Sequence, residues 1–161
     1  MKLSAKILAL VSAVVLLAAC ESNPNANGGK DGTGTSSPLD GTGQTGQLAP
    51  NVSDRVFFDY DSSTVNNDGE ATLQKQAEYL KKHSDMNVVI EGHCDERGTR
   101  EYNLALGERR ATAAKNYLVN LGVESRRVQT ISYGKERPAV VGSDESAWSQ
   151  NRRAVTVKAA Q

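Results

Sequence analysis

The chain of 161 residues has few of the residues that carry common kinds of chemistry. Two cysteines and two histidines are too few for a disulfide framework or for a zinc site built from several Cys and His ligands. Nineteen basic and nineteen acidic residues leave no excess positive charge, which argues against nucleic-acid binding through bulk charge. The length is enough for one domain with extensions, but not for two ordinary domains.

The beginning of the chain combines positive charge with a short apolar run. Lys2 and Lys6 precede residues 7–19, which are apolar except for Ser12. As a helix, a run of this length would span about 20 Å, whereas a bilayer core is about 30 Å thick. The run is therefore too short for a good permanent transmembrane helix. The pattern predicts a secretory signal peptide over residues 1–19.

The apolar run ends in Leu17-Ala18-Ala19-Cys20, which resembles the bacterial lipobox. The resemblance implies that Cys20 becomes a lipidated N-terminus; an ordinary signal that happens to end in Cys is the alternative. Stable anchoring takes more than one lipid chain, and a triacylated cysteine would satisfy this requirement. Glu21 follows where enteric lipoproteins retained in the inner membrane have Asp, so the resemblance favours the outer membrane.

A polar segment separates this start from the rest of the chain. Residues 21–50 are rich in Gly, Asn, Thr, Ser and Pro, and their large apolar residues are essentially Leu39 and Leu48. Such a composition cannot bury enough surface to offset the entropy of ordering. We therefore expect the lipidated Cys20 and a flexible, disordered linker to occupy residues 20–50. A loosely packed arm lying on the domain is the alternative.

From residue 51 to residue 161 the composition is that of one globular domain. Hydrophobic periodicity and turn residues predict strands over 56–60, 87–91, 128–133 and 154–158, and helices over 66–83, 101–121 and 144–150. The order β-α-β-α-β-α-β predicts an α+β fold, an α/β sandwich with helices packed on a mixed four-stranded sheet.

The helix predicted over 101–121 carries two stripes of residues. The apolar face comprises Leu104, Gly107, Ala111, Ala114, Leu118 and Leu121, and Gly122 follows as a stop. Asn103, Leu106 and Arg110 are spaced i, i+3, i+7 and form a second stripe beside it. Arg110 is therefore expected at the edge of the core, near the polar loop that follows the strand 87–91.

Asp95 lies in that loop, and an acid and a guanidinium in one cleft can bind a zwitterion. The guanidinium fork would take the ligand's carboxylate and the aspartate its ammonium. A buried structural ion pair between Asp95 and Arg110 is the alternative from the residues alone.

The segment GHCDERGTREYNLALGERRATAAKNYL, residues 92–118, resembles the OmpA-like peptidoglycan-binding domain family. The segments FFDYDSS at 57–63, ISYGKERPAV at 131–140 and NRRAV at 151–155 match in the same order. The likeness covers roughly residues 55–158. With the lipobox and linker, the layout is most similar to the peptidoglycan-associated lipoprotein branch of that family.

The resemblance implies non-covalent binding of the peptidoglycan stem peptide at its meso-diaminopimelate residue, whose end is a zwitterion. Carried over, Asp95 pairs with the ammonium and Arg110 with the carboxylate. Arg97 lies beside them, and groups around Tyr60 and Asp61 form the opposite wall. Lysine-type stem peptides lack that carboxylate and would leave Arg110 unpaired.

The family also implies a place in the cell. It predicts an outer-membrane lipoprotein whose domain faces the periplasm and ties the membrane to the cell wall. Expected partners are peptidoglycan, the outer membrane through the lipid anchor, and Tol proteins, notably a periplasmic propeller protein. Roles in envelope integrity and cell division follow from the Tol connection. No cofactor, metal or nucleic acid is expected.

Two other functions compete with this interpretation. A cell-wall hydrolase would need paired acid and base groups, and Asp61 with Asp95 is the one dyad the sequence offers. A pure protein-interaction module is the other alternative.

A metal site at residues 93–96 is disfavoured, because consecutive residues near a strand end alternate sides. His93 is expected to be a hydrogen-bonded structural residue. Cys94, where many relatives have Thr, is expected to be a small buried hydrophobe that faces away from Asp95. Of Arg152 and Arg153, one is a candidate for the binding face and the other for a structural or solvated charge.

Overall fold

The computed structural model describes residues 47–159. The strands are β1 (Gln47–Ala49), β2 (Val52–Ser53), β3 (Arg55–Phe57), β4 (Val88–His93), β5 (Val128–Gly134) and β6 (Arg153–Lys158). The α-helices are α1 (Asn67–Lys82), α2 (Arg100–Asn120) and α3 (Glu145–Asn151), and a 3-10 turn, η1 (Ser125–Arg127), precedes β5. The predicted signal peptide, Cys20 and most of the predicted linker lie outside the described residues.

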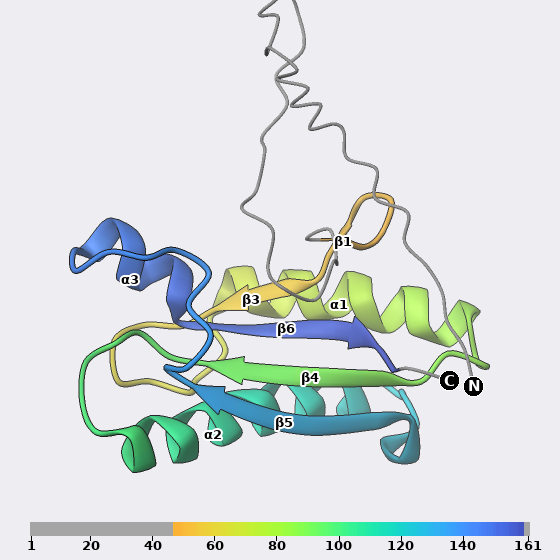
Figure 1. Ribbon diagram of the computed structural model, residues 1–161. Coiled ribbons are helices and arrows are strands. Elements are labelled where there is room, and N and C mark those ends of the chain that lie inside the picture. Colours follow the sequence, from red (N-terminus) through yellow and green to blue (C-terminus); the bar gives the residue numbers. More distant parts are fainter. Residues whose placement is uncertain (1–46, 160–161) are drawn as a thin grey trace, which may run out of the picture. The chain divides into compact units, whose positions relative to one another are not determined.

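Four strands form one mixed sheet in the order β3-β6-β4-β5. Strand β4 pairs with β5 in parallel and with β6 antiparallel, and β6 pairs with β3 antiparallel. Helices α1 and α2 lie against one face of this sheet, and α3 stands at the end where β3, β4 and β5 finish (Figure 1). The predicted α+β fold with a mixed four-stranded sheet is thereby confirmed.

Each α-helix begins at a side chain that accepts a hydrogen bond from the first turn. Asn66 accepts from the backbone N–H of Gly69, Thr99 from that of Tyr102, and Asp144 from that of Ala147. Such caps satisfy backbone donors that have no partner inside the helix. The cap at Thr99 fixes the start of α2 directly after the loop that leaves β4.

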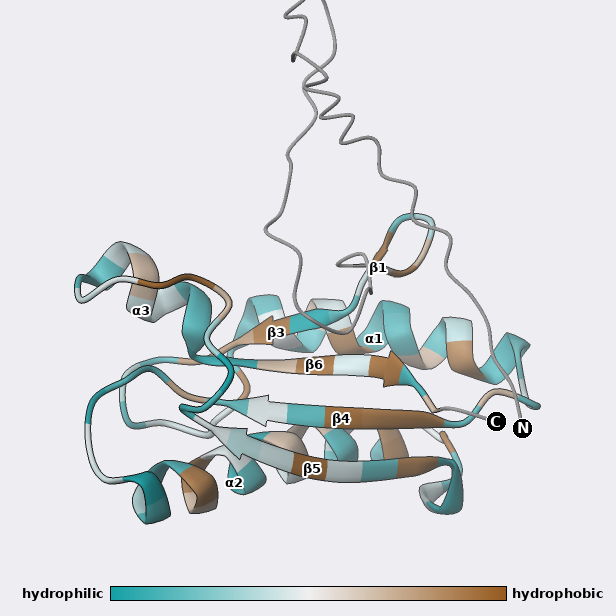
Figure 2. Ribbon diagram, viewed as in Figure 1, coloured by the Kyte–Doolittle hydropathy of each residue, from teal (hydrophilic) through white to brown (hydrophobic). Residues whose placement is uncertain are grey.

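The core lies between the sheet and the two long helices. It is built mainly from Leu, Val, Ile and Ala, including Leu73 and Leu80 of α1, Ile90 of β4 and Leu118 of α2. Figure 2 shows that β4 is hydrophobic where it begins and more polar toward its end, beside hydrophilic loops. Polar side chains therefore gather at this end of the sheet, beside the loops.

Two glycines bring α2 close to the sheet at that end. A Cβ on Gly92 of β4 would lie 1.9 Å from the carbonyl oxygen of Gly107 in α2. A Cβ on Gly107 would lie 2.3 Å from the Oγ of Ser132 in β5. Both distances are too short for any side chain, so glycine at these positions is what permits the close packing.

The structure corrects the sequence expectations in three places. The linker was expected to reach residue 50, but Leu48 is buried in the core within a small β1-β2 hairpin. The strand predicted over 56–60 is β3, which ends at Phe57, because the chain turns at residues 59–62 and Asp61 adopts a φ of 50°. On α2, Leu104 is exposed, whereas Leu106 is buried with Arg110.

Candidate functional site

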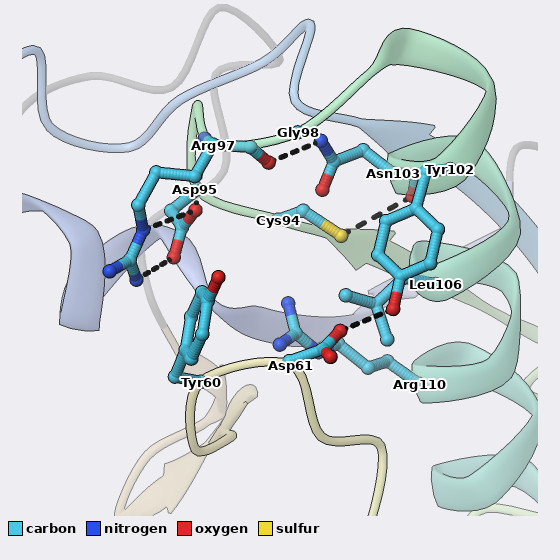
Figure 3. Close-up of a pocket in the computed structure, with 10 residues that line it drawn as sticks. All are labelled: Tyr60, Asp61, Cys94, Asp95, Arg97, Gly98, Tyr102, Asn103, Leu106 and Arg110. Carbon is cyan, nitrogen blue, oxygen red and sulfur yellow. Dashed lines mark hydrogen bonds and ion pairs between the residues drawn. The ribbon is translucent and has the colours of Figure 1, made fainter.

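A small hollow opens at the polar end of the sheet, where β3 and β4 end and α2 begins. Its volume is about 100 Å³. Its lining includes all five predicted binding residues, namely Tyr60, Asp61, Asp95, Arg97 and Arg110. Cys94, Gly98, Tyr102, Asn103 and Leu106 complete the lining (Figure 3). Ordinary ligand pockets hold roughly 300–1,000 Å³, so this hollow suits the end of a ligand and not a whole one.

Arg110 reaches the hollow from α2 and is 1% exposed. Its Nε donates to the carbonyl oxygen of Ser62 at 2.8 Å, and its Nη1 to that of His93 at 2.8 Å. Its Nη2 donates to the carbonyl oxygen of Asp59 at 3.2 Å. A guanidinium has five N–H donors, so two remain beyond these three backbone bonds, and the side chain of Arg110 also interacts with the Cys94 thiol. Burial lowers the pKa of Arg110, but a guanidinium stays protonated at neutral pH.

Asp95 stands beside the same hollow, in the loop that follows β4. It is 5% exposed, and its carboxylate is surrounded by donors. Oδ1 accepts from the backbone N–H and the Nε of Arg97, both at 3.1 Å. Oδ2 lies 2.5 Å from the Nη2 of Arg97 and 3.5 Å from the Nη1 of Arg152. Burial alone would raise the pKa of Asp95, but the bonds from Arg97 and Arg152 outweigh it and lower that pKa.

The guanidinium of Arg97 is held between two aromatic rings. Its central carbon lies 4.1 Å from the ring centroid of Tyr60 and 4.0 Å from that of Trp148. Both distances are well inside the range of cation–π attraction. Trp148 comes from α3, and its Nε1 donates to the Oε1 of Glu96 at 3.1 Å. The loop after β4 is therefore joined to α3 through both Arg97 and Glu96.

The opposite rim of the hollow is closed by a contact between Asp61 and Tyr102. The hydroxyl of Tyr102 donates to the Oδ1 of Asp61, which joins the turn after β3 to the first turn of α2. This bond raises the pKa of the Tyr102 hydroxyl. The interaction brings together residues far apart in the sequence.

The floor of the hollow is formed around Cys94, which is 2% exposed. Its Sγ donates to the carbonyl oxygen of Asn103 at 3.3 Å. The amide of Asn103 in turn donates to the carbonyl oxygens of Arg97 and Thr99, at 2.8 and 3.0 Å. Burial raises the pKa of the Cys94 thiol to about 11. The thiol is thus protonated at neutral pH and behaves as a small buried group, but it lines the same hollow as Asp95 instead of turning away from it.

His93 does not line the hollow, although its carbonyl oxygen accepts from Arg110. Its side chain is fully buried, and its Nε2 lies 3.6 Å from the Oε2 of Glu91. The centroid of its ring lies 5.5 Å from that of the Tyr133 ring. Within residues 47–159, no group of three or more His, Cys, Asp or Glu side chains is placed to hold a metal ion. In the same range, no helix has the length and apolarity needed to cross a membrane.

The sequence left open which arginine at the start of β6 would reach the site. Neither arginine lines the hollow, but Arg152 contacts Asp95 and also donates from Nε to the carbonyl oxygen of Phe58 at 3.0 Å. Arg153 is buried and donates toward the carbonyl oxygen of Arg137 at 3.4 Å. Sequence reasoning missed Tyr102 and Trp148. Their signal was weak, because an aromatic residue in a helix is usually interpreted as core.

Comparison with known proteins identifies a family that this chain matches. Residues 57–153 match the OmpA family. A peptidoglycan-associated lipoprotein of Mesorhizobium japonicum is 50% identical over 93% of this chain and 89% of its own length. One of Pseudomonas aeruginosa is 42% identical over 92% of this chain and 93% of its own length.

A solved structure supports the same relationship. The crystal structure of the peptidoglycan-associated lipoprotein from Burkholderia pseudomallei is 46% identical, with a TM-score of 0.66. The match covers 70% of this chain and 95% of that one. The chain therefore belongs to the OmpA family, within which it is similar to peptidoglycan-associated lipoproteins in both sequence and fold.

Proposed function

We propose that this domain binds peptidoglycan non-covalently by holding the zwitterionic end of a diaminopimelate residue in the hollow between Asp95 and Arg110. One observation carries the proposal: a buried carboxylate and a buried guanidinium line the same small hollow. The ammonium of the ligand would meet Asp95 and its carboxylate would meet the remaining N–H donors of Arg110. The names of the relatives, peptidoglycan-associated lipoproteins, agree with peptidoglycan as the binding partner.

The size and the charge of the hollow support this ligand. A volume of about 100 Å³ admits an amino-acid terminus and leaves the rest of the stem peptide outside. Arg97 and Arg152 keep Asp95 ionised, so that it can accept a cationic group. Tyr60 and Asp61 stand on the turn after β3 and would face the ligand from the other wall.

The same features favour binding over hydrolysis. A hydrolase needs a carboxyl group that donates a proton near neutral pH. The pKa of Asp95 is instead shifted downward by its arginine partners. The carboxylate of Asp61 is bonded to the Tyr102 hydroxyl. Asp95 therefore lacks the raised pKa that a general acid requires. Release of muropeptides from sacculi would be evidence for the hydrolase instead.

Calorimetric titration of the full chain tests the binding proposal. A stem peptide containing meso-diaminopimelate is expected to bind, and its lysine counterpart to bind at least about tenfold more weakly, because it leaves the Arg110 donors unpaired. Asp95→Asn should weaken binding of the diaminopimelate peptide by at least about tenfold. Asp85→Asn, an exposed acid outside the hollow, is the matched control. Equal affinity of wild type and Asp95→Asn would remove Asp95 from the site.

We further propose that the protein is an outer-membrane lipoprotein, anchored through Cys20, whose domain faces the periplasm and takes part in the Tol system. The lipobox at residues 17–20 and the similarity to lipoproteins support the anchor. Reversible binding repeated over many copies would suffice to hold the membrane to the wall and support envelope integrity during cell division. Cys20→Ala should release the protein from membrane fractions; unchanged fractionation would contradict the anchor.

A Tol partner, in particular a periplasmic propeller protein, is expected to share the surface around the hollow. Pull-down of that partner from a periplasmic extract should then weaken as soluble peptidoglycan fragments are added. A complex that survives saturating fragments would contradict a shared surface.

A further inference from the structure

Arg97 occupies the place on Asp95 that the proposed function gives to the ligand's ammonium. Its Nε lies 3.1 Å from Oδ1 and its Nη2 lies 2.5 Å from Oδ2, so both carboxylate oxygens are engaged by one fork. A cation that binds Asp95 from the hollow must compete with this fork. The negative charge of Asp95 is therefore already balanced by an arginine of the same chain.

Of the two arginines on Asp95, Arg97 is the one that is able to move. Its side chain is 29% exposed, whereas that of Arg152 is 8% exposed. Arg152 is also held by the carbonyl oxygen of Phe58 and by the carboxylate of Glu145. Release of Arg97 would leave Arg152 in place, so Asp95 would stay ionised while one side of it became open.

The two aromatic rings give Arg97 a place to remain after it leaves Asp95. The central carbon of the guanidinium lies over the rings of Tyr60 and Trp148, whereas Asp95 is bonded to its Nε and Nη2. The contacts of the central carbon with the rings do not require Nε and Nη2 to stay on Asp95. A small shift along the rings would break the bonds to Asp95 and keep the charge stacked.

The frame around Arg97 is fixed independently of its side chain. The carbonyl oxygen of Arg97 accepts from Asn103, and the carbonyl oxygens of Glu96 and Gly98 accept from Lys135 at 3.1 and 2.7 Å. Gly98 has a φ of 90°, a conformation that glycine adopts without strain. A movement of the Arg97 side chain therefore leaves the backbone of the loop unchanged.

We propose that Arg97 is a specificity-determining residue, an internal counter-ion that closes Asp95 in the free protein and gives way to the ligand's ammonium. This proposal rests on the proposed function of the same hollow. A lone ammonium gains only Asp95 when it displaces the fork. A zwitterion gains Asp95 and the remaining donors of Arg110 together, and its carboxylate also meets the displaced guanidinium. The exchange therefore admits diaminopimelate and excludes lysine.

Trp148 supplies a direct readout, because it is the single tryptophan of the chain and stacks on Arg97. The full-length protein in detergent micelles is titrated with a diaminopimelate stem peptide and with its lysine counterpart, by calorimetry and by tryptophan emission. The variants are Arg97→Gln, which removes the charge, and Arg97→Lys, which keeps the charge without the fork. Arg100→Gln is the control, since Arg100 is an exposed neighbour that contacts Glu136 instead of Asp95.

In the wild type, the emission of Trp148 should change with the same affinity that calorimetry measures for the diaminopimelate peptide. In Arg97→Gln, the lysine peptide should bind about tenfold more tightly than to the wild type, so discrimination falls. Arg97→Lys should give an intermediate ratio, and Arg100→Gln should behave as wild type. Thermal unfolding of each variant checks that the fold is retained.

Failure of the exchange at Arg97 can be distinguished from failure of the proposed function. Binding of the diaminopimelate peptide with constant Trp148 emission, or an unchanged ratio of affinities in Arg97→Gln, would overturn the exchange at Arg97 and leave the proposed function standing. No binding of either peptide by the wild type would overturn the proposed function and this proposal together.

Discussion

The Nη1 of Arg110 donates to the carbonyl oxygen of His93 at 2.8 Å, and this bond joins helix α2 to the end of strand β4. The same guanidinium bonds to the carbonyl oxygens of Ser62 and Asp59 in the turn after β3. Three segments of the chain that surround the hollow thus meet at one buried side chain. A residue proposed to bind the ligand is at the same time part of the fold.

Arg110→Ala is therefore expected to lower stability as well as ligand binding. The substitution leaves three carbonyl oxygens without their donor, and we expect the free energy of unfolding to fall by about 3 kcal/mol. Urea unfolding followed by circular dichroism measures this. The neighbouring Arg109→Ala, on the exposed side of α2, should stay within about 0.5 kcal/mol of wild type. A fully stable Arg110→Ala protein would show that these three bonds contribute little.

Gly92→Ala should be among the most damaging changes of a single methyl group. The added Cβ would lie 1.9 Å from the carbonyl oxygen of Gly107, so α2 would have to move away from β4. We expect the free energy of unfolding to fall by about 3 kcal/mol or more. Gly107→Ala should also be destabilising, but less so, because the nearest backbone atom to its added Cβ, the carbonyl oxygen of Gly92, is 2.9 Å away. The Ser132 hydroxyl, at 2.3 Å, would have to leave its bonds to Leu104 and Gly134. Thermal unfolding of the two variants beside Ala105→Ser, on the exposed face of α2, gives the comparison.

Asp95 should contribute stability that depends on pH. Its folded-state pKa is depressed, so the contribution is complete above its unfolded value of about 4 and is lost as the pH falls through the folded-state pKa. Asp95→Asn should therefore be less stable than wild type by about 2 kcal/mol at pH 7. That difference should shrink below about pH 4. Urea unfolding at a series of pH values measures it, and a difference that stays constant down to pH 2 would contradict the prediction.

Cys94 should be almost unreactive while the protein is folded. Raising a thiol pKa from 9.0 to about 11 lowers the thiolate fraction at pH 8 by about 100-fold, and burial slows access further. In a Cys20→Ala protein Cys94 is the only thiol, so a colourimetric thiol reagent reports on it alone. The reaction should be at least about 100-fold slower in buffer than in denaturing urea. Equal rates in the two solutions would mean that the floor of the hollow is open.

Local pattern was sufficient for most of the fold. The spacing of Leu73, Ala77 and Leu80 predicts α1, and all three are buried. Leu48 was missed because a single leucine in a polar segment carries no periodicity, and only tertiary packing draws it into the core. Leu104 was misplaced because Gly92 and Gly107 set the rotation of α2 against the sheet, and that contact is not visible in helical spacing alone.

The sequence predicted five residues that line the hollow, but not Tyr102 and not the bonds among them. Asp95 and Arg110 share a hollow, as expected, because Arg110, in the middle of α2, reaches the end of β4, which Asp95 follows closely. Two of the side chains that contact Asp95 and Arg97 come from distant parts of the chain. Arg152 follows Asp95 by more than fifty residues, and Trp148 reaches Arg97 from a helix on another connection. Such contacts depend on the order of strands in the sheet, which hydrophobic periodicity does not specify.

The antiparallel pairing of β3 with β6 has a mechanical consequence. Residues 55–57 lie beside residues 153–155, and Phe58 extends the ladder by a bond to the carbonyl oxygen of Arg152. A pull along the axis of β3, with the hollow held in place, would draw this strand lengthwise along β6. Bonds stretched in this direction bear tension side by side and yield together, so even this short strand resists being peeled away.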